Sequence, residues 1–269
     1  MNFFQNAVSY RSKSLEGDMM KKFLILLSGA VFFTLVLAGC SEKMPPVDVL
    51  LAHSLHEAQQ GNWEKAGTLA ASVLKKHPEN LHANILAALA LRNTEKFQEA
   101  MDTISQAVKL APNDFTARYL KGSFHYSQKQ YAEAAEELTR AFRLKPSDRN
   151  TAILLAQSHF ALKNQQPAAS YYKRFLQHPQ HRRDPIPVNA MGILHVKSRP
   201  AFAEKCFLYA GQLAPRDPVT ALNTAIFYER TNRISHARNY YQRFLTLAET
   251  HPEFGSLVKQ VRDRLGKLR

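Results

Sequence analysis

The sequence predicts an all-α protein, a right-handed α-solenoid of about six helix pairs with a C-terminal capping helix. Two sets of residues recur along the chain at intervals of 34 positions. The small residues are Ala66, Ala100, Ala134 and Ala168, and the prolines are Pro78, Pro112 and Pro146. A fixed period of this length is typical of a helix-turn-helix unit that is copied and stacked. A helical bundle without repeats would match both sets only by accident.

The unit that contains Ala100 and Pro112 shows how each repeat is built. A helix is expected over 81–92, a turn over 93–96 and a second helix over 97–110. Pro112 ends the second helix, because proline lacks a backbone N–H and disfavours helix in the residue before it. Ala100 falls where the two helices cross, and its small side chain allows them to approach closely.

Consecutive units carry a pattern of residue types that resembles the tetratricopeptide repeat family. The pattern has a Gly or Ala in the first helix, an aromatic residue, alanines and apolar residues in the second, and a late proline. One unit fills it with Ala88, Phe97, Ala100, Ile104, Ala107 and Pro112, and the next with Gly122, Tyr131, Ala134, Leu138, Ala141 and Pro146. The resemblance implies stacked helix pairs that bind a protein partner.

The later units follow this pattern less closely. Gln165 and Pro200 stand where the aromatic residue is expected, and one extra residue shifts the frame after the fourth unit. Six units are counted over residues 47–251. Residues 252–269 are expected to form the capping helix, because one face is apolar and the other carries Lys and Arg, as the end of a solenoid requires. The apolar stripe consists of Leu257, Val258, Val261 and Leu265.

The N-terminal region has the features of an export signal. Lys21 and Lys22 precede sixteen uncharged residues, 23–38, and Gly39 and Cys40 follow. This order of a basic region, an apolar core and small residues is typical of a secretory signal peptide. The cysteine resembles that of the bacterial lipobox, and the resemblance implies a lipid on Cys40 and cleavage before it. An uncleaved anchor helix or a plain signal peptide is the alternative.

These features divide the part of the chain that precedes the repeats into two segments. Residues 1–39 are interpreted as the signal peptide, with Met19 or Met20 as the true start, and residues 40–46 as a lipidated tether. Several acyl chains hold a protein stably on a bilayer, whereas one chain alone is marginal. We therefore expect a lipid-anchored protein of the cell envelope, on the periplasmic side of the outer membrane if the source is Gram-negative.

Positive charge is concentrated in the second half of the chain. The full sequence has a formal net charge of +14. Residues 40–148 contain thirteen basic and thirteen acidic residues, whereas residues 149–269 contain nineteen basic and seven acidic ones. The asymmetry predicts contact with an anionic surface or partner, and a solvated basic face is the alternative. Nucleic acid is not expected as a partner, because the chain is predicted to be exported.

The family resemblance also implies where a partner would bind. First helices line the concave side of such solenoids, and the corresponding positions here are mostly apolar, which suits a peptide or an amphipathic helix. The predicted groove residues are Leu51, Leu55, Ile85, Leu89, Arg92, Tyr119, Tyr126, Ile153 and Phe160. The alternative is that several of them belong to the core between repeats, since the two faces differ by one helical step.

No catalytic or cofactor motif is found. The sequence has no nucleophile elbow, zinc-protease, dinucleotide-binding or phosphate-loop pattern. His53 and His56 share one helix face, but no third ligand stands nearby, so neither a metal nor a cofactor is expected. We interpret the chain as a binding protein and not as an enzyme.

The overall plan resembles the pilotin-type lipoproteins of type IV or Tad pilus systems. Those proteins combine a lipobox with about six tetratricopeptide repeats and help a secretin ring reach or assemble in the outer membrane. The resemblance implies a membrane-anchored interaction scaffold for a pilus or secretion complex. Two alternatives stay open: an adaptor for cell-wall or exopolysaccharide machinery, and a non-catalytic partner of an envelope enzyme.

Overall fold

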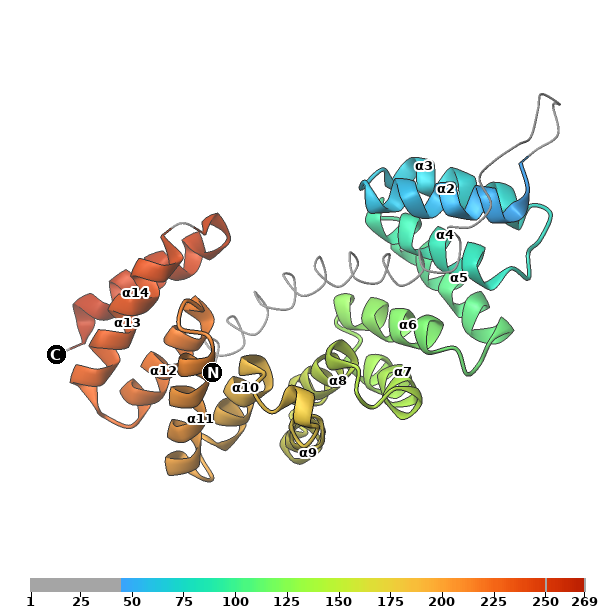
Figure 1. Ribbon diagram of the computed structural model, residues 1–269. Coiled ribbons are helices and arrows are strands. Elements are labelled where there is room, and N and C mark those ends of the chain that lie inside the picture. Colours follow the sequence, from blue (N-terminus) through green and yellow to red (C-terminus); the bar gives the residue numbers. More distant parts are fainter. Residues whose placement is uncertain (1–44, 250, 269) are drawn as a thin grey trace. The chain divides into compact units, whose positions relative to one another are not determined.

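The computed structural model describes residues 45–249 and 251–268, and every regular element in that part of the chain is helical (Figure 1). Cys40, the predicted signal peptide and most of the predicted tether lie outside the described residues. The fold class predicted from the 34-residue period is confirmed, because successive helices form pairs along the chain and a single helix follows the last pair.

The described α-helices form six successive pairs and one closing helix. The pairs are α2 (Val47–Gln59) and α3 (Trp63–Leu74), α4 (Leu81–Asn93) and α5 (Phe97–Leu110), α6 (Phe115–Ser127) and α7 (Tyr131–Leu144), α8 (Arg149–Ala161) and α9 (Gln165–Leu176), α10 (Pro185–His195) and α11 (Pro200–Leu213), and α12 (Pro218–Arg230) and α13 (Ile234–Ala248). The closing helix is α14 (Gly255–Lys267), and the short 3-10 helices are η1 (Pro179–His181) and η2 (Pro252–Phe254).

Two compact parts make up the described chain. One extends to Ser158 and the other begins at His159, so the boundary falls within α8. The first part contains α2 to α7 and most of α8, and the second contains α9 to α14.

The recurrent alanines lie where the second helix of a pair packs on its neighbours. All four of the alanines that define the period are at most 1% exposed. Ala203 and Ala237 are also fully buried, and they continue the series in the fifth and sixth pairs. A methyl group is therefore the side chain that these positions accommodate, because protein interiors are close-packed.

Most first helices begin at an acidic or amide cap. Such a side chain accepts a hydrogen bond from a backbone N–H in the first turn, which would otherwise have no partner. Asp114 accepts from the N–H of Ala117 at 2.8 Å at the start of α6. The caps of this kind are Asn80, Asp114, Asp148, Asp184 and Asp217. They set the start of each new pair.

In five of the six described pairs, the turn between the two helices contains a residue with left-handed backbone. In the second pair Glu95 has a φ of 64°, and the N–H of Lys96 donates to the carbonyl of Leu91 at 2.8 Å. This backbone bond closes a Schellman-type end to the first helix. The left-handed residues of these turns are Gly61, Glu95, Lys129, Lys163 and Asn232, with φ between 58° and 83°. Only the first is a glycine, so the sequence gives little sign of this conformation.

The closing helix α14 covers the apolar end of the sixth pair. Leu257 and Val261 are at most 1% exposed and belong to the core cluster formed by α12 and α13. On the solvent side, Arg264 forms an ion pair with Glu229, and Glu229 also accepts a hydrogen bond from the hydroxyl of Tyr241 at 2.5 Å. These contacts are what the predicted capping role requires.

Candidate partner-binding surfaces

The predicted groove residues divide into buried and partly exposed side chains. The buried ones are Leu55, Ile85, Leu89, Tyr119 and Ile153, each at most 6% exposed. The partly exposed ones are Leu51, Arg92, Tyr126 and Phe160. The second group is the one that a partner can reach without a rearrangement of side chains.

Core packing accounts for Leu55 in particular. Its side chain lies in one cluster with Ala66, Ala70 and Leu86, so it joins the first pair to the second. This matches the alternative that some apolar groove positions belong to the core between repeats. Helix α4 shows why the sequence leaves that choice open: every residue from Ala83 to Ala90 is buried, so the helix has no polar face to mark the groove.

Two of the partly exposed groove residues contact aromatic rings of a neighbouring element. The guanidinium of Arg92 lies 5.2 Å from the ring centroid of Phe124, on the first helix of the next pair. The rings of Tyr126 and Tyr131 meet edge to face, with centroids 5.5 Å apart. Both contacts hold long side chains in place beside the predicted groove.

A charged cluster between α6 and α7 was not anticipated from the sequence. Arg118 Nη1 lies 2.7 Å and Lys121 Nζ 3.0 Å from the carboxylate of Glu137, and Arg118 Nε donates to the carbonyl of Pro112 at 2.8 Å. Burial opposes ionisation of Glu137, but the hydrogen bonds from the two cations outweigh it and lower its pKa. The cluster joins the two helices of one pair, and its groups are engaged with one another.

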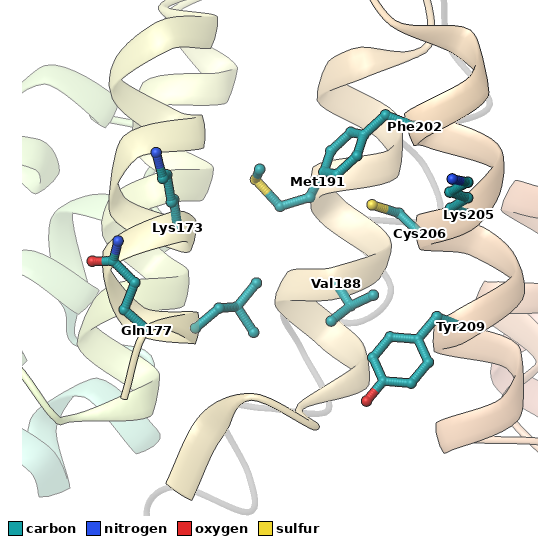
Figure 2. A pocket seen from close by; sticks show the side chains of 9 residues that line it. Lys173, Gln177, Val188, Met191, Phe202, Lys205, Cys206 and Tyr209 are labelled. Carbon is teal, nitrogen blue, oxygen red and sulfur yellow. The ribbon is translucent and has the colours of Figure 1, made fainter. Parts of the chain in front are cut away.

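The second compact part contains a cleft between α9 and α11, with α10 as its floor (Figure 2). Its volume is about 480 Å³. The lining residues are Lys173, Leu176, Gln177, Val188, Met191, Phe202, Lys205, Cys206 and Tyr209. None of these residues is a predicted groove position. The sequence did not indicate that they lie close together, because they come from two consecutive helix pairs.

Cys206, which lines the cleft, packs as a small apolar residue. It is a buried free cysteine, and burial raises the pKa of its thiol to about 11. The thiol is therefore protonated near neutral pH and is a poor nucleophile. Within residues 45–249 and 251–268, no group of three potential metal ligands converges, and no helix is long and apolar enough to cross a membrane.

The family models match the central repeats. The model described as "Anaphase-promoting complex, cyclosome, subunit 3" matches residues 59–141 and 107–175. A TPR repeat-containing protein of Methanocaldococcus jannaschii is 29% identical over 86 residues, which cover 32% of this chain and 15% of that protein. The matched segment is thus a small fraction of the length of that relative.

Solved structures with the same fold cover most of the chain. The PilF structure of Pseudomonas aeruginosa has a TM-score of 0.66 at 21% identity, covering 81% of this chain and 97% of PilF. A tetratricopeptide repeat protein of Parabacteroides merdae has a TM-score of 0.64 at 14% identity, covering 82% and 93% of the two chains. The chain is thus similar to tetratricopeptide repeat proteins in the sequence of its central repeats and in fold over most of its length.

Proposed function

We propose that this protein is a membrane-anchored scaffold that holds a partner protein and assists the assembly of a pilus or secretion complex. The observation that carries the proposal is the order of features along the chain. A lipobox-like sequence ending at Cys40 directly precedes six helix pairs and a closing helix. Pilotin-type lipoproteins have this order of features. The similarity in fold to PilF, which extends over 97% of the PilF chain, supports the same organisation here.

The short distance between the predicted lipid and the first helix supports a role at the membrane surface. Helix α2 begins at Val47, seven positions after Cys40. Seven residues span at most roughly 25 Å when fully extended. A lipid on Cys40 keeps the first repeats within that distance of the bilayer, where a scaffold meets envelope proteins.

The partner is a protein that contacts the first-helix surface of the first compact part through Leu51, Arg92 and Tyr126. Their side chains are partly exposed, and they combine apolar or aromatic area with one cation. Aromatic residues and arginine contribute most strongly to protein interfaces. Such a surface suits a helix or peptide with an apolar face.

The uneven charge favours one alternative function. Residues 149–269 contain nineteen basic and seven acidic residues, which suits contact with an anionic polymer or an anionic headgroup layer. An adaptor for cell-wall or exopolysaccharide machinery would use this half in that way.

Membrane fractionation combined with co-purification tests the proposal. Wild-type protein and a Cys40→Ala variant are expressed at natural levels, with Lys259→Ala at an exposed position of α14 as the control. We expect wild type and control in the membrane fraction together with secretin or pilin subunits, and Cys40→Ala in the soluble fraction. Full membrane retention of Cys40→Ala would refute the lipid anchor. Recovery of wall synthases or hydrolases in place of secretin or pilin would favour the alternative.

A further inference from the structure

The cleft between α9 and α11 has an apolar base, formed by α10 and by the facing residues of α9 and α11. Val188 and Met191 come from α10, one turn apart, and Phe202 and Cys206 come from α11, one turn apart (Figure 2). Leu176 of α9 completes the floor. The methionine side chain adapts readily to different partners, which favours binding over fixed packing.

The two walls of the cleft repeat the same arrangement of polar groups. Lys173 of α9 is followed four residues later by Gln177, the C-cap of that helix, and Lys205 and Tyr209 stand four residues apart on α11. Each wall therefore presents an ammonium group and, one turn later, a neutral hydrogen-bonding group beside the apolar floor. The side chains of Lys173, Gln177, Lys205 and Tyr209 are all exposed.

No carboxylate of these helices neutralises the two lysines. Residues 165–213, all of them described, contain seven Lys and Arg residues but only two acidic residues. Asp184 caps α10 through a hydrogen bond to the N–H of Ile186, and Glu204 is held by Arg233 at 2.7 Å and by the hydroxyl of Tyr228. The cleft is thus apolar at its base and positive at both edges, which suits an occupant of opposite pattern.

We propose that this cleft docks an amphipathic helix of a partner protein, with an apolar underside and acidic residues along both flanks. From Phe202 to Tyr209 the α11 wall extends for about 10 Å, or two helical turns. An apolar stripe at positions i, i+3, i+4 and i+7 has the same length, and glutamates beside it reach Lys173 and Lys205. This inference rests on the proposed function in that the repeats hold a protein, and it adds a second contact, formed by α9, α10 and α11 of the second compact part.

Two synthetic peptides test the proposal with the full chain in detergent. Both are fluorescein-labelled helices with leucines at i, i+3, i+4 and i+7; one carries glutamates on both flanks and the other lysines. We expect the glutamate peptide to bind wild type at least tenfold more tightly than the lysine peptide. A Lys173→Glu/Lys205→Glu double variant is expected to reverse that preference, whereas Lys259→Glu on α14, an exposed control, keeps it.

Alkylation of Cys206 shows whether the peptide occupies the cleft. The glutamate peptide is expected to slow modification of this buried thiol by a maleimide, measured by mass spectrometry of the Cys206 fragment. Equal affinity for the two peptides, or unchanged preference in the double variant, would overturn the proposal. It is also overturned if dodecanoate protects Cys206 and the peptide does not, because the cleft would then take a lipid.

Partner capture separates this inference from the proposed function. If the double variant co-purifies secretin or pilin as well as wild type does and shows no peptide preference, the scaffold function stands and the cleft plays no part in it. If wild type captures no envelope protein but binds the glutamate peptide as described, the cleft stands and the assembly function fails.

Discussion

Small residues at the helix crossings determine how closely each pair packs. A β-carbon added at Gly122 would lie 2.7 Å from Leu138 Cγ and 3.2 Å from its backbone nitrogen. The recurrent alanines, which the sequence identified, occupy the facing helix, and burial confirms them. Most of the left-handed turn residues escaped prediction because Glu and Lys, unlike Gly and Asn, have no preference for that backbone.

Gly122→Ala is expected to lower the free energy of unfolding by about 1–3 kcal/mol, because the methyl group overpacks the contact with Leu138. Gly266→Ala in α14 is the matched control, since nothing lies within 4 Å of its added β-carbon. The control should gain roughly 0.5–1 kcal/mol from helix propensity. Urea denaturation measures both, and equal effects of the two substitutions would contradict the close packing.

Lys129→Gly is expected to stabilise the protein by up to about 1 kcal/mol. The φ of Lys129 is 61°, a conformation that costs an L-residue roughly 1–2 kcal/mol and costs glycine little. Lys145→Gly serves as control, because the φ of Lys145 is −140°, so glycine there increases the entropy of the unfolded chain and removes the contact of Lys145 Nζ with the Phe115 ring, 5.3 Å from its centroid. Thermal melts should therefore shift in opposite directions, and a lower midpoint for Lys129→Gly would argue against the turn geometry.

At the scale of elements, a helix that is buried on all sides has no sequence pattern that distinguishes a binding surface from the core. Helices α4 and α8 are buried along eight consecutive residues, Ala83–Ala90 and Thr151–Ser158, so their apolar pattern has no single face. The groove prediction included five residues of these two helices, and the sequence could not separate the three buried ones, Ile85, Leu89 and Ile153, from the partly exposed Arg92 and Phe160. Second helices such as α5 and α7 have one apolar and one polar face, so their boundaries could be predicted from the sequence.

Glu137→Gln is expected to lower the free energy of unfolding at pH 7 by roughly 3 kcal/mol. The change leaves the buried guanidinium of Arg118 without its carboxylate, and breaking a buried pair is costly. Glu136→Gln is the control, because its pair with Arg140 is exposed and is worth about 0.5 kcal/mol or less. Chemical denaturation at pH 7 compares the two variants.

The same pair of variants tests the pH dependence. Because the folded protein lowers the pKa of Glu137, its ionised form stabilises the fold above the ordinary value of 4.5, and this stability is lost as the pH falls through the lowered pKa. The gap between wild type and Glu137→Gln should therefore narrow below pH 4.5. A gap that stays constant down to pH 3 would show that Glu137 does not act through its charge.

Removal of residues 250–269 is expected to destabilise the sixth pair. Leu257 and Val261 leave the core cluster of α12 and α13, and apolar area is exposed at the end of the repeats. We predict a lower thermal midpoint and stronger binding of an apolar dye. Arg264→Ala removes only the half-exposed ion pair with Glu229 and should change either measurement little. If Arg264→Ala lowers the thermal midpoint as much as the truncation does, the ion pair and not the apolar contact stabilises the end of the repeats.

At the scale of the whole molecule, periodicity predicted the number of helix pairs and the closing helix, because each unit must bury its apolar faces against the next. The cleft at α10 escaped prediction, because its residues are spread from Lys173 to Tyr209 and meet only through stacking. Function therefore depends on surfaces that consecutive units share, and the central claim is that these surfaces hold a protein partner.

Site-specific photo-crosslinking in living cells of the source organism tests that claim most directly. A benzophenone amino acid replaces Tyr126 on the first-helix surface, or Arg262 on the exposed side of α14 as control. We predict one predominant envelope protein crosslinked at position 126 and absent at position 262. No crosslinked protein at position 126, or the same set of proteins at both positions, would contradict the account.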